Sequence, residues 1–208
     1  IEVYPSSQLG DVGASQEAIQ MNTLDMAVTN LAVIGSVIPE FGAVGGPFLF
    51  ESDEHIQKAM EGELGQYYAD KAAEKGLNIC GYLYTGFRHC FTSKPINTVD
   101  DFKGLKIRTM ENQNHMAFWS ALGAAPTPLA WPEVYISLQN GTIDAQENAA
   151  DTCMTSNFQE VQKYLNFTNH ILYLNQIIIN NDKFNSLDPL YQDALTQAVE
   201  EAIAELRP

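Results

Sequence analysis

Apolar and polar positions along the chain alternate with two periods, one typical of helices and one typical of strands. The segments with the helical period are residues 15–21, 53–73, 114–122, 132–141 and 189–206, with a short amphipathic turn at 159–165. The segments with strand character are residues 1–4, 24–28, 77–84, 106–109 and 171–180. Because helical and strand segments follow each other in turn, the pattern predicts an α/β fold.

Capping and turn residues set the expected ends of several of these elements. Ser15 and Asp53 are the expected N-caps of the first two helices, and Gly123 is expected to end the third. Residues 42–47 are expected to form a loop, and the proline-containing residues 125–128 a linker.

Two copies of one short pattern lie in different halves of the chain. Residues 19–25 (IQMNTLD) closely match residues 138–144 (LQNGTID). In each copy a helix ends at an Asn or Gly that tolerates the left-handed conformation, and a strand follows. We interpret the pair as a duplicated α/β lobe with a cleft between the copies, although this pattern is also a common exit from a helix. Ligands of open α/β sheets bind beyond the carboxyl ends of strands, where Asn30, Arg108 and Asn148 are expected.

Composition and charge narrow the classes of partner. The chain has 208 residues, of which 45% are hydrophobic, enough for one large domain or two small lobes. A net charge of −15 argues against nucleic acid or an anionic membrane surface as a partner. No apolar run reaches the length of a membrane span, so direct membrane insertion is not expected.

The cysteines and histidines do not predict a metal site. Cys80, Cys90 and Cys153 lack the spacing of metal ligands, and the histidines are scattered along the chain. We therefore expect no metal and no other cofactor. The cysteines are interpreted as thiols that fill apolar space, with a Cys80–Cys90 disulfide as the alternative.

Arg108 is the residue whose chemistry most needs an explanation. It lies at the end of the expected strand 106–109 in a strongly acidic chain, and the polar Glu111 follows three residues later. A guanidinium offers a planar fork of donors that matches a carboxylate, so Arg108 is a candidate for binding an acid. A structural salt bridge with Asp100 or Asp101, or a solvated strand end, explains the residue equally well.

Seven short motifs, taken in order, resemble one family of proteins. They are YPSSQLG at 4–10, GFR at 86–88, KGLKIR at 103–108, GAAPTP at 123–128, EVY at 133–135, QNGTIDAQEN at 139–148 and TNH at 168–170. Each motif is weak alone, but the ordered set covers essentially the whole chain. It resembles the DctP-type solute-binding proteins of tripartite ATP-independent periplasmic (TRAP) transporters.

The resemblance implies a fold, a location and a partner. It implies a periplasmic protein with two α/β lobes joined by crossing strands, which captures an organic acid in the cleft and delivers it to a membrane permease. The implied N-terminal lobe comprises residues 1–91 and 174–208, and the C-terminal lobe residues 92–173. Compared with the family, the opening strand and the final helices are missing, so we expect a longer polypeptide.

The same resemblance assigns candidate binding residues. Arg108 matches the arginine that forms a salt bridge with the ligand carboxylate, and Asn148 matches an asparagine that hydrogen-bonds the ligand. Trp131 falls where a bulky residue lines the pocket, whereas Asn30 and Glu111 fall at positions that vary with the ligand.

Two further basic residues complete the candidate set. Lys94 stands where relatives that bind sialic acid carry a second arginine, which weakens a sialic-acid interpretation. It adds long-range attraction for an anion or is an ordinary surface lysine. Arg88 is included as a candidate ligand contact, although bracing of the strands between the lobes is the favoured interpretation.

Physical chemistry leaves alternatives open at the other positions. Asn148 is suited to a hydroxyl next to a carboxylate, but it could also cap the helix that follows. Trp131 could stack on a sugar-like ligand or pack in the core. Glu111 would repel a second ligand carboxylate and accept hydrogen bonds from hydroxyls, which favours a polyhydroxy monoacid, unless it is simply solvated.

The favoured function is therefore capture of a sugar acid or hydroxy acid, without catalysis. The alternatives are a binding protein for an amino-acid-like zwitterion or a dicarboxylate, a sensory domain with the same cleft, and a lyase or hydrolase that uses Glu111 or Asp144 near Arg108. The sequence contains no nucleophile–base pair, phosphate-binding loop or metal cluster that would support the enzyme.

Overall fold

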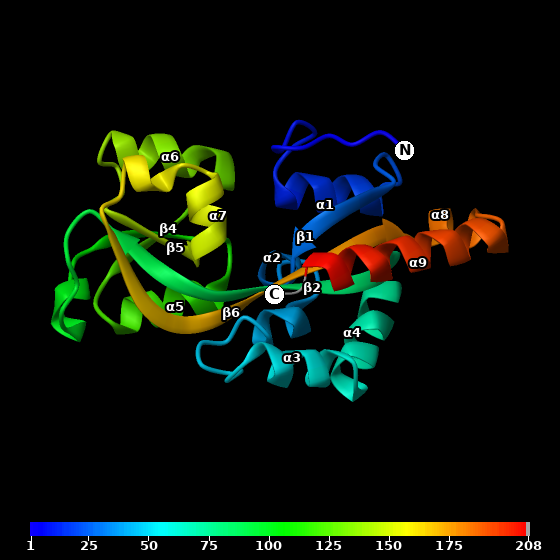
Figure 1. Ribbon diagram of the computed structural model, residues 1–208, viewed down its shortest axis with the longest axis horizontal. Helices are drawn as coiled ribbons and strands as arrows, with labels where there is room; N and C mark the ends of the chain where they lie inside the picture. The colour runs from blue at the N-terminus through cyan, green and yellow to red at the C-terminus, as the bar shows by residue number, and fades with distance from the viewer. Residues whose placement is uncertain (207–208) are drawn as a thin grey trace.

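A computed structural model of the chain describes residues 1–206 and contains one six-stranded sheet with the order β1-β6-β2-β5-β3-β4 (Figure 1). β3 pairs in parallel with β4 and β5, and the other neighbours are antiparallel. The strands are β1 (Met26–Asn30), β2 (Leu77–Thr92), β3 (Lys106–Thr109), β4 (Ala125–Pro128), β5 (Ala145–Ala149) and β6 (Tyr164–Asn180).

Helices cover both ends of this sheet. The α-helices are α1 (Val12–Gln20), α2 (Leu31–Ile34), α3 (Asp53–Met60), α4 (Glu63–Ala73), α5 (Gln113–Ala121), α6 (Trp131–Gln139), α7 (Ala150–Thr155), α8 (Asn181–Ser186) and α9 (Pro189–Leu206). Short 3₁₀ turns are found at η1 (Pro39–Ala43), η2 (Val99–Phe102) and η3 (Phe158–Glu160).

Two long strands join two groups of elements. β2 has 16 residues and β6 has 17, and they pair with each other along most of their length. Figure 1 shows them crossing the centre of the molecule, with β1, α1–α4, α8 and α9 at one end and β3–β5 and α5–α7 at the other. The predicted α/β fold with two lobes joined by crossing strands is confirmed.

Each end of the molecule has its own apolar core. One core packs α1–α4 against β2 and β6 and includes Ile19, Phe41 and Ile178. At the other end, consecutive residues of β2 point to opposite sides of the sheet, since Cys90 joins one cluster with Trp119 and Phe91 joins another with Val134. Because each lobe buries its own core, the two lobes are connected mainly by β2 and β6 and by contacts between the lobes.

The repeated pattern of the sequence has the same helix-end geometry in both places. Asn22 after α1 and Gly141 after α6 both have left-handed backbone angles, with φ values of 56° and 74°. Each helix therefore ends as the sequence indicated.

Several predicted helix boundaries are wrong. α1 begins earlier than expected, because Asp11 rather than Ser15 accepts a hydrogen bond from the backbone N–H of Ala14 at 2.9 Å. Ser52 rather than Asp53 caps α3. The single helix expected over 53–73 is broken at Gly62, and Gly65 lies so close to the backbone of Met60 that a Cβ would be only 1.7 Å from its carbonyl oxygen.

The linker expected at residues 125–128 is also wrong, since these residues form β4. Ala125–Pro128 pairs in parallel with β3 at the edge of the sheet. Proline is compatible with an edge strand because its missing N–H faces away from a partner. The strands expected at 77–84 and 171–180 are parts of β2 and β6. Both strands are longer than expected and continue into the lobe that contains β3–β5.

All three cysteines are free thiols, as favoured from the sequence, and no Cys80–Cys90 disulfide is formed.

Candidate binding site between the lobes

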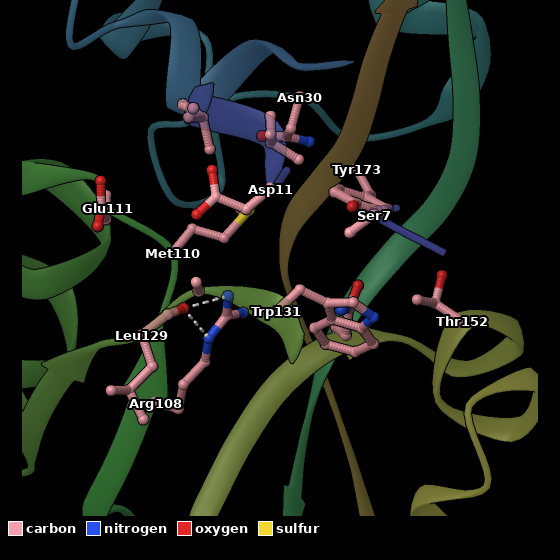
Figure 2. Close-up of a pocket in the computed structure, with 15 residues that line it drawn as sticks. Ser7, Asp11, Asn30, Arg108, Met110, Glu111, Leu129, Trp131, Thr152 and Tyr173 are labelled. Atoms are coloured by element: carbon pink, nitrogen blue, oxygen red, sulfur yellow. Dashed lines mark hydrogen bonds between the residues drawn. The ribbon is translucent and has the colours of Figure 1, made fainter. Parts of the chain in front are cut away.

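A cavity of about 180 Å³ lies between the two groups of elements. Ser7, Asp11 and Asn30 line it from one lobe, and Arg108, Trp131, Asn148 and Thr152 from the other (Figure 2). Arg108 and Asn148 come from the parallel strands β3 and β5, and Leu129 follows β4, which pairs in parallel with β3 on its other side. The carboxyl ends of parallel strands meet at one edge, which is why residues distant in sequence converge here.

Arg108 is held in the cavity wall by backbone. Its Nε and Nη2 donate to the carbonyl oxygen of Leu129 at 2.9 and 2.6 Å, and the side chain is buried (Figure 2). Its Nη1 makes no hydrogen bond to any of residues 1–206. The outer edge of the guanidinium, formed by Nη1 and the second Nη2 hydrogen, therefore remains available to a ligand.

The alternative salt bridges of Arg108 with Asp100 and Asp101 are wrong. Asp100 pairs with Lys103 at 2.7 Å, and Asp101 accepts hydrogen bonds from the N–H groups of Asn97 and Thr98. Within the described residues, Arg108 forms no ion pair with a carboxylate.

The charge of Arg108 is only partly compensated. Burial, followed by the positive charge of Arg88, lowers the pKa of Arg108 to about 10. The guanidinium is still protonated at neutral pH, so this wall of the cavity carries a desolvated positive charge that favours an anion.

Trp131 packs in the lobe core and also lines the cavity. Its ring stacks on Phe158 in the C-terminal lobe core, with centroids 4.9 Å apart, and it also lines the cavity. The guanidinium carbon of Arg108 lies 5.6 Å from its ring centre.

Asn148 is buried and is oriented by two donors. Its Oδ1 accepts from Nη1 of Arg88 at 3.0 Å and from the backbone N–H of Ala149 at 2.9 Å. It does not cap α7, whose N-cap residue is Ala149 without a side-chain cap. The capping alternative is therefore wrong.

Arg88 lies behind the cavity wall and is not among the residues that line the cavity. It is fully buried, and its Nε and Nη2 donate to the two carboxylate oxygens of Glu147 at 2.5 and 3.0 Å. Nη2 also donates to the backbone carbonyl of Glu147 at 2.6 Å. Because Arg88 is on β2 and Glu147 on β5, the pair joins a strand that crosses between the lobes to its neighbour in the second lobe.

Glu147 is the acceptor at the centre of this buried group. Nε2 of His170 lies 3.1 Å from its Oε2, and Nδ1 of His115 lies 3.8 Å from Oε1, too far for a hydrogen bond. Burial alone would raise the pKa of Glu147, but the charge of Arg88 and the bonds from His170 and Arg88 outweigh it and hold the pKa well below its usual range. Burial lowers the pKa of His115 to about 4.

The remaining predicted site residues are placed differently. Asn30 lines the cavity, but its Nδ2 donates to Leu174 and Asn175 and its Oδ1 caps α2 at the N–H of Ala32. Glu111 is exposed at the rim. Lys94 is exposed and is not among the residues that line the cavity.

Sequence reasoning missed four polar lining residues: Ser7, Asp11, Thr152 and Tyr173. Asp11 directs its carboxylate into the cavity (Figure 2). Its position just before an apolar helix is a signal for an N-cap, which is the role it has at the start of α1, but this signal does not indicate the cavity.

Within residues 1–206, no helix has the length and apolar character needed to cross a bilayer. The same residues contain no group of three or more side chains that could hold a metal ion.

Comparison with known proteins identifies the family. The profile of "Bacterial extracellular solute-binding protein, family 7" (DctP) matches residues 1–207. The chain is 34% identical over 203 residues to the 2,3-diketo-L-gulonate-binding periplasmic protein YiaO of Escherichia coli, covering 97% of this chain and 62% of YiaO. It is also 34% identical over 206 residues to the C4-dicarboxylate-binding periplasmic protein DctP of Rhodobacter capsulatus, covering 99% of this chain and 61% of that protein.

A solved structure has the same fold over both lobes. A TRAP periplasmic solute-binding protein from Sulfitobacter sp. NAS-14.1 with bound β-D-galacturonate matches with a TM-score of 0.96 and 29% identity, over 99% of this chain and 69% of that one. The chain thus spans slightly more than 60% of the length of the curated relatives it matches. On these matches, which cover the sequence almost from end to end, the chain belongs to the DctP family of bacterial extracellular solute-binding proteins, a family of transport binding proteins and not of enzymes.

Proposed function

We propose that this chain captures a small organic acid, most favourably a sugar acid or hydroxy acid, through a salt bridge between Arg108 and the ligand carboxylate. The observation that carries the proposal is a buried guanidinium with no acidic partner among residues 1–206, in a cavity lined by both lobes. A carboxylate that accepts from its free edge supplies the missing charge.

The acidic side chains of the cavity favour a ligand with one carboxylate over a ligand with two. Asp11 and Glu111 line the same cavity as Arg108 and would repel a second ligand carboxylate. The same carboxylates accept hydrogen bonds from ligand hydroxyls, and Ser7, Thr152 and Tyr173 add hydroxyls of their own. A polyhydroxy monoacid matches this combination. The galacturonate bound to the Sulfitobacter protein and the diketogulonate in the name of YiaO have the same chemistry.

The other candidate residues take supporting roles in this proposal. Asn148 donates to the ligand, and Trp131 provides an apolar face against a sugar ring. Asn30 shapes the cavity while its donors hold Leu174 and Asn175. Arg88 acts from behind the wall, and Lys94 contributes at most long-range attraction from the surface.

Delivery to a partner extends the proposal from the site to the whole protein. In this proposal residues 1–91 with 174–208 form one lobe, of which 207 and 208 lie outside the described residues, and residues 92–173 form the other. The closed protein hands its ligand to the membrane permease of a TRAP transporter. The periplasmic location is proposed because the curated relatives YiaO and DctP are named periplasmic proteins.

Two other classes of ligand each have an observation in their favour. The Rhodobacter relative is named for C4-dicarboxylates, so a diacid is the first. Asp11 and Glu111 could also bind a ligand ammonium group, so an amino-acid-like zwitterion is the second.

A thermal-shift screen of the intact protein distinguishes these classes. The panel contains D-galacturonate, D-glucuronate, D-erythronate, succinate, malate and several amino acids, and calorimetry follows each hit. The largest shift is expected with a sugar acid or hydroxy acid. A clear preference for succinate or for an amino acid would replace the monoacid proposal, and no shift with any acid would overturn acid capture.

A further inference from the structure

We propose that Asn112 and Asn114, together with the loop at Gly45, form a clasp that stabilises the closed arrangement, in which both lobes line the ligand cavity. The clasp lies outside that cavity and touches no ligand, so it changes the affinity for every ligand by the same factor. The inference rests on the proposed capture of a ligand between the lobes and adds contacts that set how tightly the lobes close.

Two side-chain amides of the C-terminal lobe reach backbone carbonyls of the N-terminal lobe. Asn112 is the N-cap of α5, is buried, and donates from Nδ2 to the carbonyl oxygen of Ala32 in α2 at 2.9 Å. Asn114, in the first turn of α5, donates from Nδ2 to the carbonyl oxygen of Gly42 in η1 at 2.7 Å. Both bonds therefore join the start of α5 to the segment between β1 and α3.

The loop after η1 fits closely against the C-terminal lobe. A Cβ on Gly45 would lie only 3.1 Å from Nε2 of His115, so the absence of a side chain allows the loop to approach α5. The backbone N–H of Phe48 donates to the carbonyl oxygen of His170 on β6 at 2.7 Å. The ring of Phe48 packs edge-on against Phe118 of α5, with centroids 5.8 Å apart. Phe48 makes these contacts at a φ of 58°, which residues other than glycine rarely adopt.

The clasp is separate from the ligand cavity. Asn112, Asn114 and Gly45 are not among the residues that line the cavity of about 180 Å³. Asn112 and Asn114 instead line a second cavity of about 530 Å³, together with Gly35 and Gly42. An effect of these residues on affinity therefore has to pass through the arrangement of the lobes and not through contact with the ligand.

Hydrogen-bond geometry makes the clasp sensitive to lobe separation. A displacement of about 1 Å breaks either bond, because donor and acceptor more than about 3.5 Å apart no longer form one. The separated amides and carbonyls then bond to water, so the net stabilisation by each bond is modest. The ligand cavity is lined by both lobes, so a ligand binds best to the arrangement in which the clasp is formed. Contacts that raise the population of this arrangement lower the apparent Kd of every ligand by the same factor.

Three variants weaken the clasp and leave the ligand cavity unchanged. Asn112→Ser keeps a good N-cap for α5 but loses the amide that donates to Ala32, and Asn114→Ala removes the second donor. Gly45→Ala inserts a methyl group that pushes against His115. In calorimetry each variant is expected to raise the Kd of D-galacturonate by about threefold to tenfold.

The loss has to be the same for different ligands. D-Galacturonate, D-glucuronate and D-erythronate are titrated into each variant, and the ratios between their Kd values should stay within about twofold of wild type. A loss confined to one of these acids would place the residues in the ligand site and overturn the clasp.

Gln113→Ala is the matched control. Gln113 is exposed between the two asparagines, and its side chain forms no hydrogen bond to any of residues 1–206. The control is expected to bind D-galacturonate within about twofold of wild type. Wild-type affinity in Asn112→Ser and Asn114→Ala, or an equal loss in Gln113→Ala, would overturn the inference.

A measurement of the lobe arrangement makes the test independent of the proposed ligand. Spin labels on Glu54→Cys in α3 and Glu133→Cys in α6 report the distance between the lobes by pulsed electron paramagnetic resonance. The background is Cys80→Ala, since the other two cysteines are buried. Distances are recorded without ligand and over a titration with D-galacturonate. The population that matches the distance in this structure is expected to be smaller in Asn112→Ser than in wild type.

The outcomes separate failure of the clasp from failure of the proposed function. If the difference between wild type and Asn112→Ser is present without ligand and D-galacturonate changes nothing, the clasp holds and only the proposed ligand fails. If the matching population is equal in the two proteins at every galacturonate concentration, or is absent from wild type throughout, the clasp does not stabilise closure and the inference is overturned.

Discussion

The guanidinium carbon of Arg108, near the end of β3, lies 5.6 Å from the ring centre of Trp131, the first residue of α6. Arg108 is held from one side by the carbonyl of Leu129, and Trp131 is held by stacking on Phe158. A charged donor and an aromatic face are thus fixed beside each other before any ligand arrives. Pre-organisation of this kind reduces the entropy that binding has to overcome.

Replacement of Arg108 with Lys should weaken acid binding strongly while the fold is preserved. Lysine keeps the charge but loses the planar fork, and each lost charge-assisted hydrogen bond corresponds to about 1.5–3 kcal/mol. Calorimetry with the best acid of the screen should show a Kd raised by roughly 10- to 150-fold. Unchanged affinity, with thermal stability equal to wild type, would remove Arg108 from the site.

Trp131 should report ligand binding by fluorescence. The chain has two tryptophans, and Trp119 is fully buried in the core under α5, away from the cavity. Ligand titration should therefore change the emission of wild type and of Trp119→Phe, but not of Trp131→Phe. A signal that persists in Trp131→Phe would place the responding ring elsewhere.

Neutralising the carboxylates of the cavity should shift selectivity toward diacids. Asp11→Asn keeps the cap on α1, because asparagine is as good an N-cap as aspartate, and Glu111→Gln changes an exposed rim residue. Removing these charges should improve succinate binding relative to galacturonate by about tenfold for the double variant.

Glu133→Gln is the matched control, since it removes an acidic charge from α6 at a residue that does not line the cavity. A succinate-to-galacturonate ratio that moves equally in the control, or not at all in the double variant, would contradict the charge argument.

His115 should make the folded protein less stable as the pH falls below 6.5. Burial lowers its pKa to about 4, whereas the unfolded chain has the usual value near 6.5. Between these values the unfolded state binds the additional proton, so stability decreases as pH falls from about 6.5 to about 4 and this contribution is constant below. The attraction of Glu147 opposes the shift, and the charges of Arg88, His170 and Arg108 support it.

Urea unfolding between pH 4 and 8 measures this effect. The stability difference between wild type and His115→Gln should change by up to about 3 kcal/mol across that range. His55→Gln changes an exposed histidine on α3 and is the control. A parallel pH dependence in wild type and His115→Gln would contradict the prediction.

The elements predicted well from the sequence are those whose own pattern determines them. β3 at Lys106–Thr109 and α9 at Pro189–Leu206 have the predicted bounds, because a turn glycine precedes the strand and a proline starts the long amphipathic helix. Asn30, Arg108 and Asn148 line one cavity, as expected from their places at strand ends. Strand ends can be predicted from the local sequence pattern alone.

The features that were missed depend on partners distant in the chain. Ala125–Pro128 is a strand only because β3 offers an edge, and the inner face of Asn148 is set by Arg88, 60 positions earlier. Asp11 reaches the cavity because the lobes lie against each other, which no local pattern encodes. Glu147 appeared only as part of a family motif, and its central place in the buried charge group follows from the pairing of β2, β5 and β6.

The continuity of β2 and β6 has a mechanical consequence. The lobes are connected by a pleated ribbon and not by loose loops, so any rotation of one half against the other has to be absorbed as bending and twisting of that ribbon. Its pairing register shifts between Ile79 and Gly81, between Tyr84 and Phe87, and between Arg88 and Cys90. We expect bending to concentrate at these interruptions, and the last of them begins at Arg88, whose Nη1 donates to Asn148 in the cavity wall.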